Sequence, residues 1–218
     1  MIIAGFDPSF KCAGVSIMDT DKKKIWITDV REDIGKVQNF ENVFNACERM
    51  SGHIKDIFSY LEIEPDIFMS EKPFPVGHYS AGLFALDATL FKELMFTYNS
   101  LKYVFLMSTR YLTHVHTNNG IKKYKKSDST NLVRDGLLPI FEEYGEYEII
   151  YGGNFNKKKE FKGGINNNSA ESFIILSRLF VRLNVDRNSD LMDSLFSAGK
   201  GLFTDMESIL LDKTKGGN

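Results

Sequence analysis

The sequence has little of several features that would identify a function class on their own. It has two cysteines, Cys12 and Cys47, which are too few for a disulfide framework and lie in apolar patterns, so we expect a reducing compartment. It has no basic N-terminal stretch followed by a long apolar run, and its most apolar segment, 81–91, is interrupted by Asp87 well short of a membrane span. We therefore expect a cytoplasmic protein with no membrane partner.

Charge of neither sign is in large excess. Lys and Arg number 27 and Asp and Glu number 29, which gives a formal net charge of −2. Bulk electrostatics therefore gives no argument for a nucleic acid as partner, and any binding of a polyanion must be local. Hydrophobic residues make up 43% of the 218 residues, which is enough to bury a core, and the length is that of one domain.

The order of the expected elements indicates an α/β fold. Three short strands joined by tight turns occupy the first thirty residues, and apolar residues three and four apart predict a helix over 40–61. A buried strand then ends at Glu71, and a helix over 79–98 and a strand over 101–108 follow. Strands separated by helices add in parallel through crossovers. This order is that of a ribonuclease H-like fold, a mixed five-stranded sheet in which an antiparallel three-strand meander is joined by parallel strands and flanked by helices.

The C-terminal half is expected to be mainly helical. The expected helices span 127–144, 169–184 and 190–203. Between the first two, residues 151–168 are rich in Gly, Asn and Lys, which predicts a mobile loop or a hairpin. We interpret residues 1–218 as a single domain with a Lys-, Gly- and Asn-rich insertion around 117–168.

Four carboxylates occupy positions that this topology would bring together. Asp7 ends the first strand and Glu71 the fourth, and these two strands are expected to be parallel neighbours about 4.8 Å apart. Asp190 and Asp193 are three residues apart at the start of the last expected helix, so both lie on one face of it. Converging carboxylates repel one another unless cations neutralise them, and Mg²⁺ prefers such oxygen ligands. Two Mg²⁺ ions would activate a water against a phosphodiester.

Each acid also has a structural interpretation. Asp7 precedes a proline and could be a turn residue, and Glu71 could be a solvated strand end. Asp190 could be a helix N-cap and Asp193 a favourable first-turn acid. The joint placement favours the metal site, with Glu171 of the preceding helix as a reserve ligand. We prefer the aspartate pair because it supplies two acids at a suitable spacing and is followed by small residues that would allow close packing on the sheet.

Three segments resemble the RuvC-like Holliday junction resolvases, a family of the ribonuclease H-like superfamily with phage-type members. The segments are GFDPSFKCAGVSI, FMSEKPF and SDLMDSLFSAGKGL, in the family's order. The resemblance implies that Asp7, Glu71, Asp190 and Asp193 are the catalytic and metal-binding residues. It further implies a Mg²⁺-dependent endonuclease, with two ions and Mn²⁺ as a substitute, that resolves four-way DNA junctions by paired nicks in recombination or replication. Paired nicks imply a homodimer, and the apolar helix over 79–98 is a candidate for its interface.

The same resemblance indicates residues that would contact branched DNA. Phe74 falls where such resolvases place an aromatic at the junction centre, although it could equally be a core anchor. Lys123, Lys125 and Lys126 lie in a basic cluster where the family has lysines on the DNA backbone, and the alternative is a solvated basic turn. A second lysine cluster within 157–162 could contact a DNA arm or only solubilise a loop.

Other functions stay open at the level of sequence. The enzyme could be a broader nuclease that also cuts flaps and forks, or the chain could be a non-catalytic nucleic-acid-binding protein on the same fold. A sugar-kinase or actin-like ATPase would need a second phosphate hairpin and a second lobe, which 218 residues do not provide. The abundance of Lys, Asn, Phe and Ile suggests an AT-rich genome such as that of a phage, in which case the compartment is the host cytoplasm.

Overall fold

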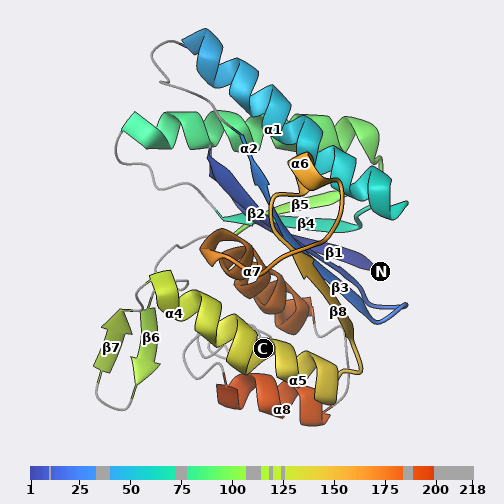
Figure 1. The fold of residues 1–218 in the computed structure, drawn as a ribbon, viewed down its shortest axis with the longest axis vertical. Helices are drawn as coiled ribbons and strands as arrows, with labels where there is room; N and C mark the ends of the chain where they lie inside the picture. Colours follow the sequence, from blue (N-terminus) through green and yellow to red (C-terminus); the bar gives the residue numbers. More distant parts are fainter. Residues whose placement is uncertain are drawn as a thin grey trace, which may run out of the picture.

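Six strands form the central sheet of the computed structural model (Figure 1). The structure describes residues 1–9, 11–32, 40–71, 78–106, 114–117, 120–123, 126–183 and 189–198. The strands of the central sheet are β1 (Ile2–Asp7), β2 (Cys12–Asp19), β3 (Lys24–Arg31), β4 (Ile67–Glu71), β5 (Lys102–Leu106) and β8 (Glu148–Gly152).

The order across this sheet is β5-β4-β1-β2-β3-β8. β1, β2 and β3 pair antiparallel, whereas β4 is parallel to β1, β5 to β4 and β8 to β3. The antiparallel meander with two parallel strands beyond β1 is the predicted ribonuclease H-like arrangement, so the fold class is confirmed.

β8 is a sixth strand that the sequence analysis missed. It extends the sheet beyond β3, with Lys24 opposite Glu148 and Thr28 opposite Gly152. The Thr28 hydroxyl donates to the Gly152 carbonyl at 2.6 Å, and Lys24 pairs with Glu148 at 2.9 Å. A five-residue edge strand is defined by its pairing with a distant partner, and its own periodicity is too short to predict it.

Helices cover both faces of the sheet (Figure 1). α1 (Phe40–Leu61) and α2 (His78–Thr97) lie on one face, and α7 (Asn167–Leu183) crosses the other. The remaining helices are α4 (Lys126–Asn131), the π-helical turns η1 (Leu132–Leu137), α5 (Leu138–Glu143), α6 (Phe155–Lys158) and α8 (Ser189–Ala198). A separate hairpin of β6 (His114–Thr117) and β7 (Gly120–Lys123) precedes α4. None of the helices in the described part of the chain is long and apolar enough to cross a bilayer.

Two hydrophobic cores lie on the two faces, because successive side chains of a strand point to opposite sides. On β1, Ile3 belongs to the core under α7, whereas Ala4 and Phe6 belong to the core under α1 and α2. α4, η1 and α5 follow one another without a break over the span predicted as one helix. The helix changes from π-helical to α-helical just before Pro139, which stands in the first turn of α5, where a missing N–H is tolerated.

Candidate active site

A row of acidic residues crosses the sheet at the end of β1. The register of β1 with β4 places Glu71 beside Asp7, as predicted. On the other side Asp7 is opposite Gly14 of β2, and Gly14 is opposite Asp29 of β3. Side chains in one row of a sheet project to the same face. Since Ile3, four residues before Asp7, packs under α7, the row of Glu71, Asp7 and Asp29 faces α7.

The two predicted strand acids differ in exposure. Asp7 is 6% exposed, and Glu71 is half-buried at the last position of its strand. Each makes an interaction within the protein. The structure brings together one part of the predicted site. This part is the pair of carboxylates at the C-terminal ends of the neighbouring parallel strands β1 and β4.

α7 lies directly on the backbone of the two central strands. A Cβ at Gly5 would overlap the carbonyl oxygen of Ser172, and one at Gly14 would overlap that of Asn168, so only glycine allows this approach. The hydroxyls of Ser16 and Ser172 meet at 2.7 Å between the same elements. The first turn of α7 is therefore seated over β2, one strand away from Asp7.

This packing corrects the expectation for the last helix. α8, which carries Asp190 and Asp193, packs mainly on α5 and η1. It lies on the side of these two helices that is away from the sheet (Figure 1). Both aspartates are exposed. Of the small residues Ser197, Ala198 and Gly199 that were expected to pack on the sheet, the first two are exposed and Gly199 lies outside the described residues. The helix that packs closely on the sheet is α7, and glycines in β1 and β2 allow this close packing.

The predicted cluster of four carboxylates is consequently not assembled in this structure. Among the described residues, no three His, Cys, Asp or Glu side chains gather closely enough to hold a metal ion. The reserve ligand Glu171 is half-buried and directly follows the first turn of α7, the helix that does lie on the sheet. The donors available at this edge are carboxylate oxygens, which suit Mg²⁺ or Mn²⁺ in chemistry.

Part of the predicted DNA-binding set cannot be placed. Phe74 and Lys125 lie outside the described residues. Lys123 is the last residue of β7 and Lys126 the first of α4, so the basic cluster joins the hairpin to that helix. α4 is attached to the start of α7, since the Thr130 hydroxyl donates to the Asn167 side-chain oxygen at 2.8 Å. α4, which begins at Lys126, therefore packs against the first turn of α7.

The segment between β8 and α7 is anchored, where the sequence analysis expected a mobile loop or a hairpin. Phe155 of α6 is fully buried, and its ring centroid lies 5.3 Å from those of Tyr60 and Phe161. Asn156 binds the end of β3 twice: its side-chain oxygen accepts the Arg31 N–H at 2.9 Å and its amide donates to the Arg31 carbonyl at 2.7 Å. The contacts to Tyr60 and Arg31 were not predicted, because they join residues 95 and 125 positions apart in the chain.

The lysines of this anchored segment are exposed at the same end of β3 as Asp29. Lys159 pairs with Asp56 at 2.8 Å, and Lys162 pairs with Glu160 at 2.7 Å. Lys157 and Lys158 project from α6, which packs against β3. Phe155 of α6 packs in the core under α1 and α2, on the face of the sheet opposite to the one that the acidic row faces. We call the exposed lysines Lys157, Lys158, Lys159 and Lys162 the α6 basic surface.

The cysteines are not candidates for a nucleophile. Burial, with the neighbouring Asp29 carboxylate second, raises the pKa of the Cys12 thiol to about 11. Burial likewise raises the pKa of Cys47 to about 11. Because the thiolate is the reactive form, a raised pKa disfavours both thiols as nucleophiles at neutral pH.

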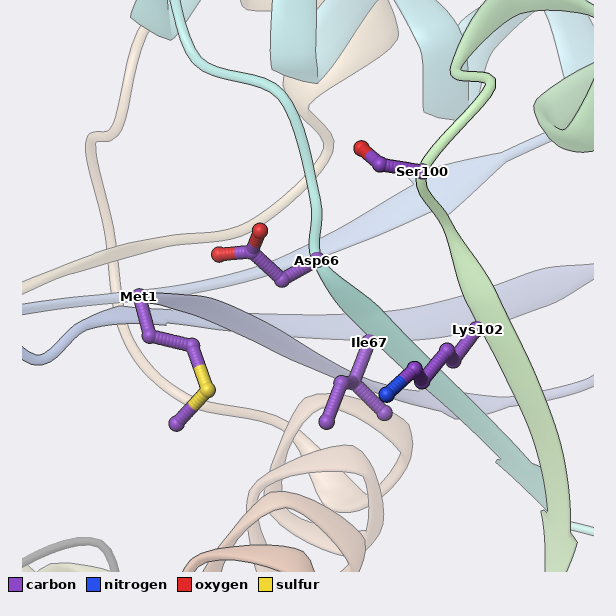
Figure 2. Close-up of a pocket in the computed structure, with 5 residues that line it drawn as sticks. All are labelled: Met1, Asp66, Ile67, Ser100 and Lys102. Atoms are coloured by element: carbon purple, nitrogen blue, oxygen red, sulfur yellow. The ribbon is translucent and has the colours of Figure 1, made fainter.

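A pocket of about 520 Å³ lies at the opposite end of the strands (Figure 2). Its lining residues are Met1, Asp66, Ile67, Ser100 and Lys102. The Asp66 carboxylate accepts the N–H of Ile2 at 2.7 Å and thereby joins the starts of β1 and β4. The pocket is separated from the acidic row by the length of the sheet, so we assign it no part in the chemistry.

The strand order and the acids at the strand ends define this chain as an α/β protein with a ribonuclease H-like fold. No family model and no curated protein sequence matches it. Among solved structures it is similar to Thermus thermophilus RuvC in complex with a Holliday junction substrate, with 12% identity and a TM-score of 0.46 over 85% of this chain and 97% of that one. It is also similar to the fowlpox virus Holliday junction resolvase, with 16% identity and a TM-score of 0.41 over 84% and 99%. It is similar as well to the human cytomegalovirus terminase nuclease domain, with 12% identity and a TM-score of 0.37 over 90% of this chain and 81% of that one.

Proposed function

We propose that this protein is a metal-dependent endonuclease that cuts branched DNA, with the four-way junction as its preferred substrate. The observation that carries the proposal is the pairing of Asp7 with Glu71 at the ends of neighbouring parallel strands, under a helix whose first turn lies directly on the sheet. Hard oxygen donors held on rigid strands are what a phosphodiester-cleaving metal site requires.

Asp7 and Glu71 would hold the metal, and Glu171 is our preferred third ligand; its carboxylate is not gathered with the other two in this structure and would have to turn toward them. α7 is the helix seated on the sheet beside Asp7, whereas α8 packs on α5 and η1. Asp190 and Asp193 stay the alternative prediction for the helix ligands. Bound Mg²⁺, or Mn²⁺ in its place, would make a nucleophile from water and stabilise the charge on the leaving oxygen. The task of the protein is to keep the acids fixed, which the buried Asp7 and the close helix packing favour.

DNA would be held by two groups of basic residues. Lys123, Lys125 and Lys126 in one group and the α6 basic surface in the other would contact phosphates without regard to sequence. Phe74 would stack on an unpaired base at the junction centre, which is worth about 1–3 kcal/mol. Binding of this local kind is compatible with a net charge of −2.

Two nicks across a symmetric junction need two active sites, so we propose a homodimer. α2 offers a surface for a second copy. Phe84 and Phe91, two turns apart on this helix, are each 42% exposed, and Phe96 is 80% exposed. Aromatic side chains exposed along one helix are a common sign of a protein interface.

The test is cleavage of a labelled four-way junction in Mg²⁺ or Mn²⁺, with linear duplex, flap and fork DNA in parallel. The native chain should nick the junction on opposed strands, and Asp7→Asn should bind it without cutting. Equal cutting by both proteins, or binding without cutting by both, would refute the metal-site proposal. Equal cutting of flaps and forks by the native chain would replace the junction resolvase by a broader branched-DNA nuclease.

A further inference from the structure

A third acid of the row, Asp29 on β3, was not singled out by the sequence analysis. It is fully buried, and both of its carboxylate oxygens are engaged. One oxygen accepts Arg31 Nε–H at 2.7 Å and the Cys12 thiol at 3.3 Å. The other accepts the side-chain amide of Asn166 at 2.6 Å. A buried carboxylate with a full set of donors is a fixed point of the structure.

Asn166 connects this fixed point to the start of α7. Its backbone carbonyl accepts the N–H of Ala170 at 2.9 Å, so it is the N-cap residue of the helix. Its side-chain oxygen accepts the Ser169 N–H at 3.0 Å, and its own N–H donates to the Ser169 hydroxyl at 3.0 Å. The same side chain thus caps α7 through its oxygen and is tied to Asp29 through its nitrogen.

A second link runs parallel to the first. The Asn168 side-chain amide donates to the carbonyl of Cys12, the residue whose thiol donates to Asp29. Glycines in β1 and β2 set how closely α7 approaches the sheet, and the hydrogen bonds of Asn166 and Asn168 join the start of α7 to β2 and β3. The Asp29–Asn166 bond fixes the helix at the end that carries Glu171.

We propose that Asp29 is a positioning residue of the nuclease site: through Asn166 it fixes the first turn of α7, and with it the Glu171 carboxylate, relative to Asp7. This inference rests on the proposed function. Asp29 itself is saturated by Arg31, Cys12 and Asn166, so it holds no ion and acts only through its neighbours.

The experiment compares Mn²⁺ binding, followed by the electron paramagnetic resonance of free Mn²⁺, with the Mn²⁺ dependence of junction cleavage. In Asp29→Asn one oxygen becomes an NH₂ group that faces either Asn166 or Arg31, and in both orientations donor meets donor. We expect Mn²⁺ binding to weaken and the Mn²⁺ midpoint of cleavage to rise by about 10- to 100-fold, as for other residues that orient metal ligands. Junction binding should stay as in the native chain.

Two further variants separate positioning from general loss of structure. Exchanging the pair, Asp29→Asn with Asn166→Asp, lets an amide at 29 donate to a carboxylate at 166 that still caps the helix, and should recover most of the Mn²⁺ affinity. Asp66→Asn removes a carboxylate that accepts a backbone N–H at the other end of the sheet and should leave the Mn²⁺ midpoint unchanged. If Asp29→Asn does not fold, Asn166→Ser keeps the capping oxygen, loses the amide and should show the same shift.

The outcomes distinguish this proposal from the one on which it rests. A native chain that neither binds Mn²⁺ nor cuts would overturn the proposed function and this inference together. A native chain that does both, with an unchanged Mn²⁺ midpoint in Asp29→Asn or no recovery in the exchanged pair, would overturn the positioning role alone.

Discussion

The close contact between α7 and β2 leads to a sharp prediction for Gly14→Ala. The new Cβ would overlap the Asn168 carbonyl oxygen and lie 2.9 Å from the Ser169 nitrogen. Both obstacles are backbone atoms of a helix, so neither can rotate away. To restore an ordinary contact the first turn of α7 must lift from the sheet by about 1.5 Å, and overpacking of this kind costs about 1–3 kcal/mol.

The same displacement would move Glu171 away from Asp7. A misplacement of about 1 Å at a catalytic group can reduce the rate about 100-fold. We therefore expect Gly14→Ala to lower the midpoint of urea unfolding and to cut a four-way junction about 100-fold more slowly, with DNA binding retained. Urea unfolding and single-turnover cleavage at saturating enzyme measure the two effects separately.

Gly52→Ala is the matched control. Gly52 lies in α1, where a new Cβ meets nothing within 4 Å, and alanine in a helix is favoured over glycine by about 1 kcal/mol. This variant should be as active as the native chain and slightly more stable. If Gly14→Ala unfolds and cuts like the native chain, the seating of α7 on the strand backbone has been assigned wrongly.

Three further predictions address other parts of the molecule. The raised pKa values of Cys12 and Cys47 mean that, as pH rises, the folded state loses these thiol protons at higher pH than the unfolded state does. The free energy of unfolding should therefore fall as pH rises from about 9 to 11. Both thiols should also react slowly with iodoacetamide near pH 7, and rapid labelling of the folded chain would contradict this. Phe91→Asp should convert a dimer to a monomer in light scattering, and a native chain that is already monomeric at micromolar concentration would remove the proposed interface. Lys157→Ala combined with Lys158→Ala should weaken binding to all DNA sequences and flatten its salt dependence, and an unchanged salt slope would exclude the α6 basic surface from the DNA contact.

Helices and strands that are marked by a local sequence pattern were predicted well. The buried positions of α1 recur at helical spacing, as at Cys47, Met50 and Ile54, and β4 ends where prolines follow. The placement of Asp7 beside Glu71 followed from topology alone, because crossover connections make β1 and β4 parallel neighbours.

The choice between two candidate helices could not be made from acid spacing. Asp190 and Asp193 matched a motif, whereas the helix that reaches the sheet is selected by Gly5 and Gly14, where missing side chains leave room for the backbone of α7. These glycines are visible in the sequence, but their partners Asn168 and Ser172 on α7 are more than 150 residues away. Asp29 had a weak local signal, since it continues the alternation of the buried residues Ile25 and Ile27 and so points inward.

Cleavage of a four-way junction by Glu171→Gln and by Asp193→Asn tests the central claim most directly, that α7 supplies the acid that completes the Asp7 and Glu71 pair. The measurement is the single-turnover rate in Mn²⁺. We predict a loss of more than about 100-fold for Glu171→Gln, since even residues that only orient metal ligands cost about 10- to 100-fold, and a rate near that of the native chain for Asp193→Asn. The reverse pattern, with Asp193→Asn inactive and Glu171→Gln active, would contradict the claim and return the site to α8.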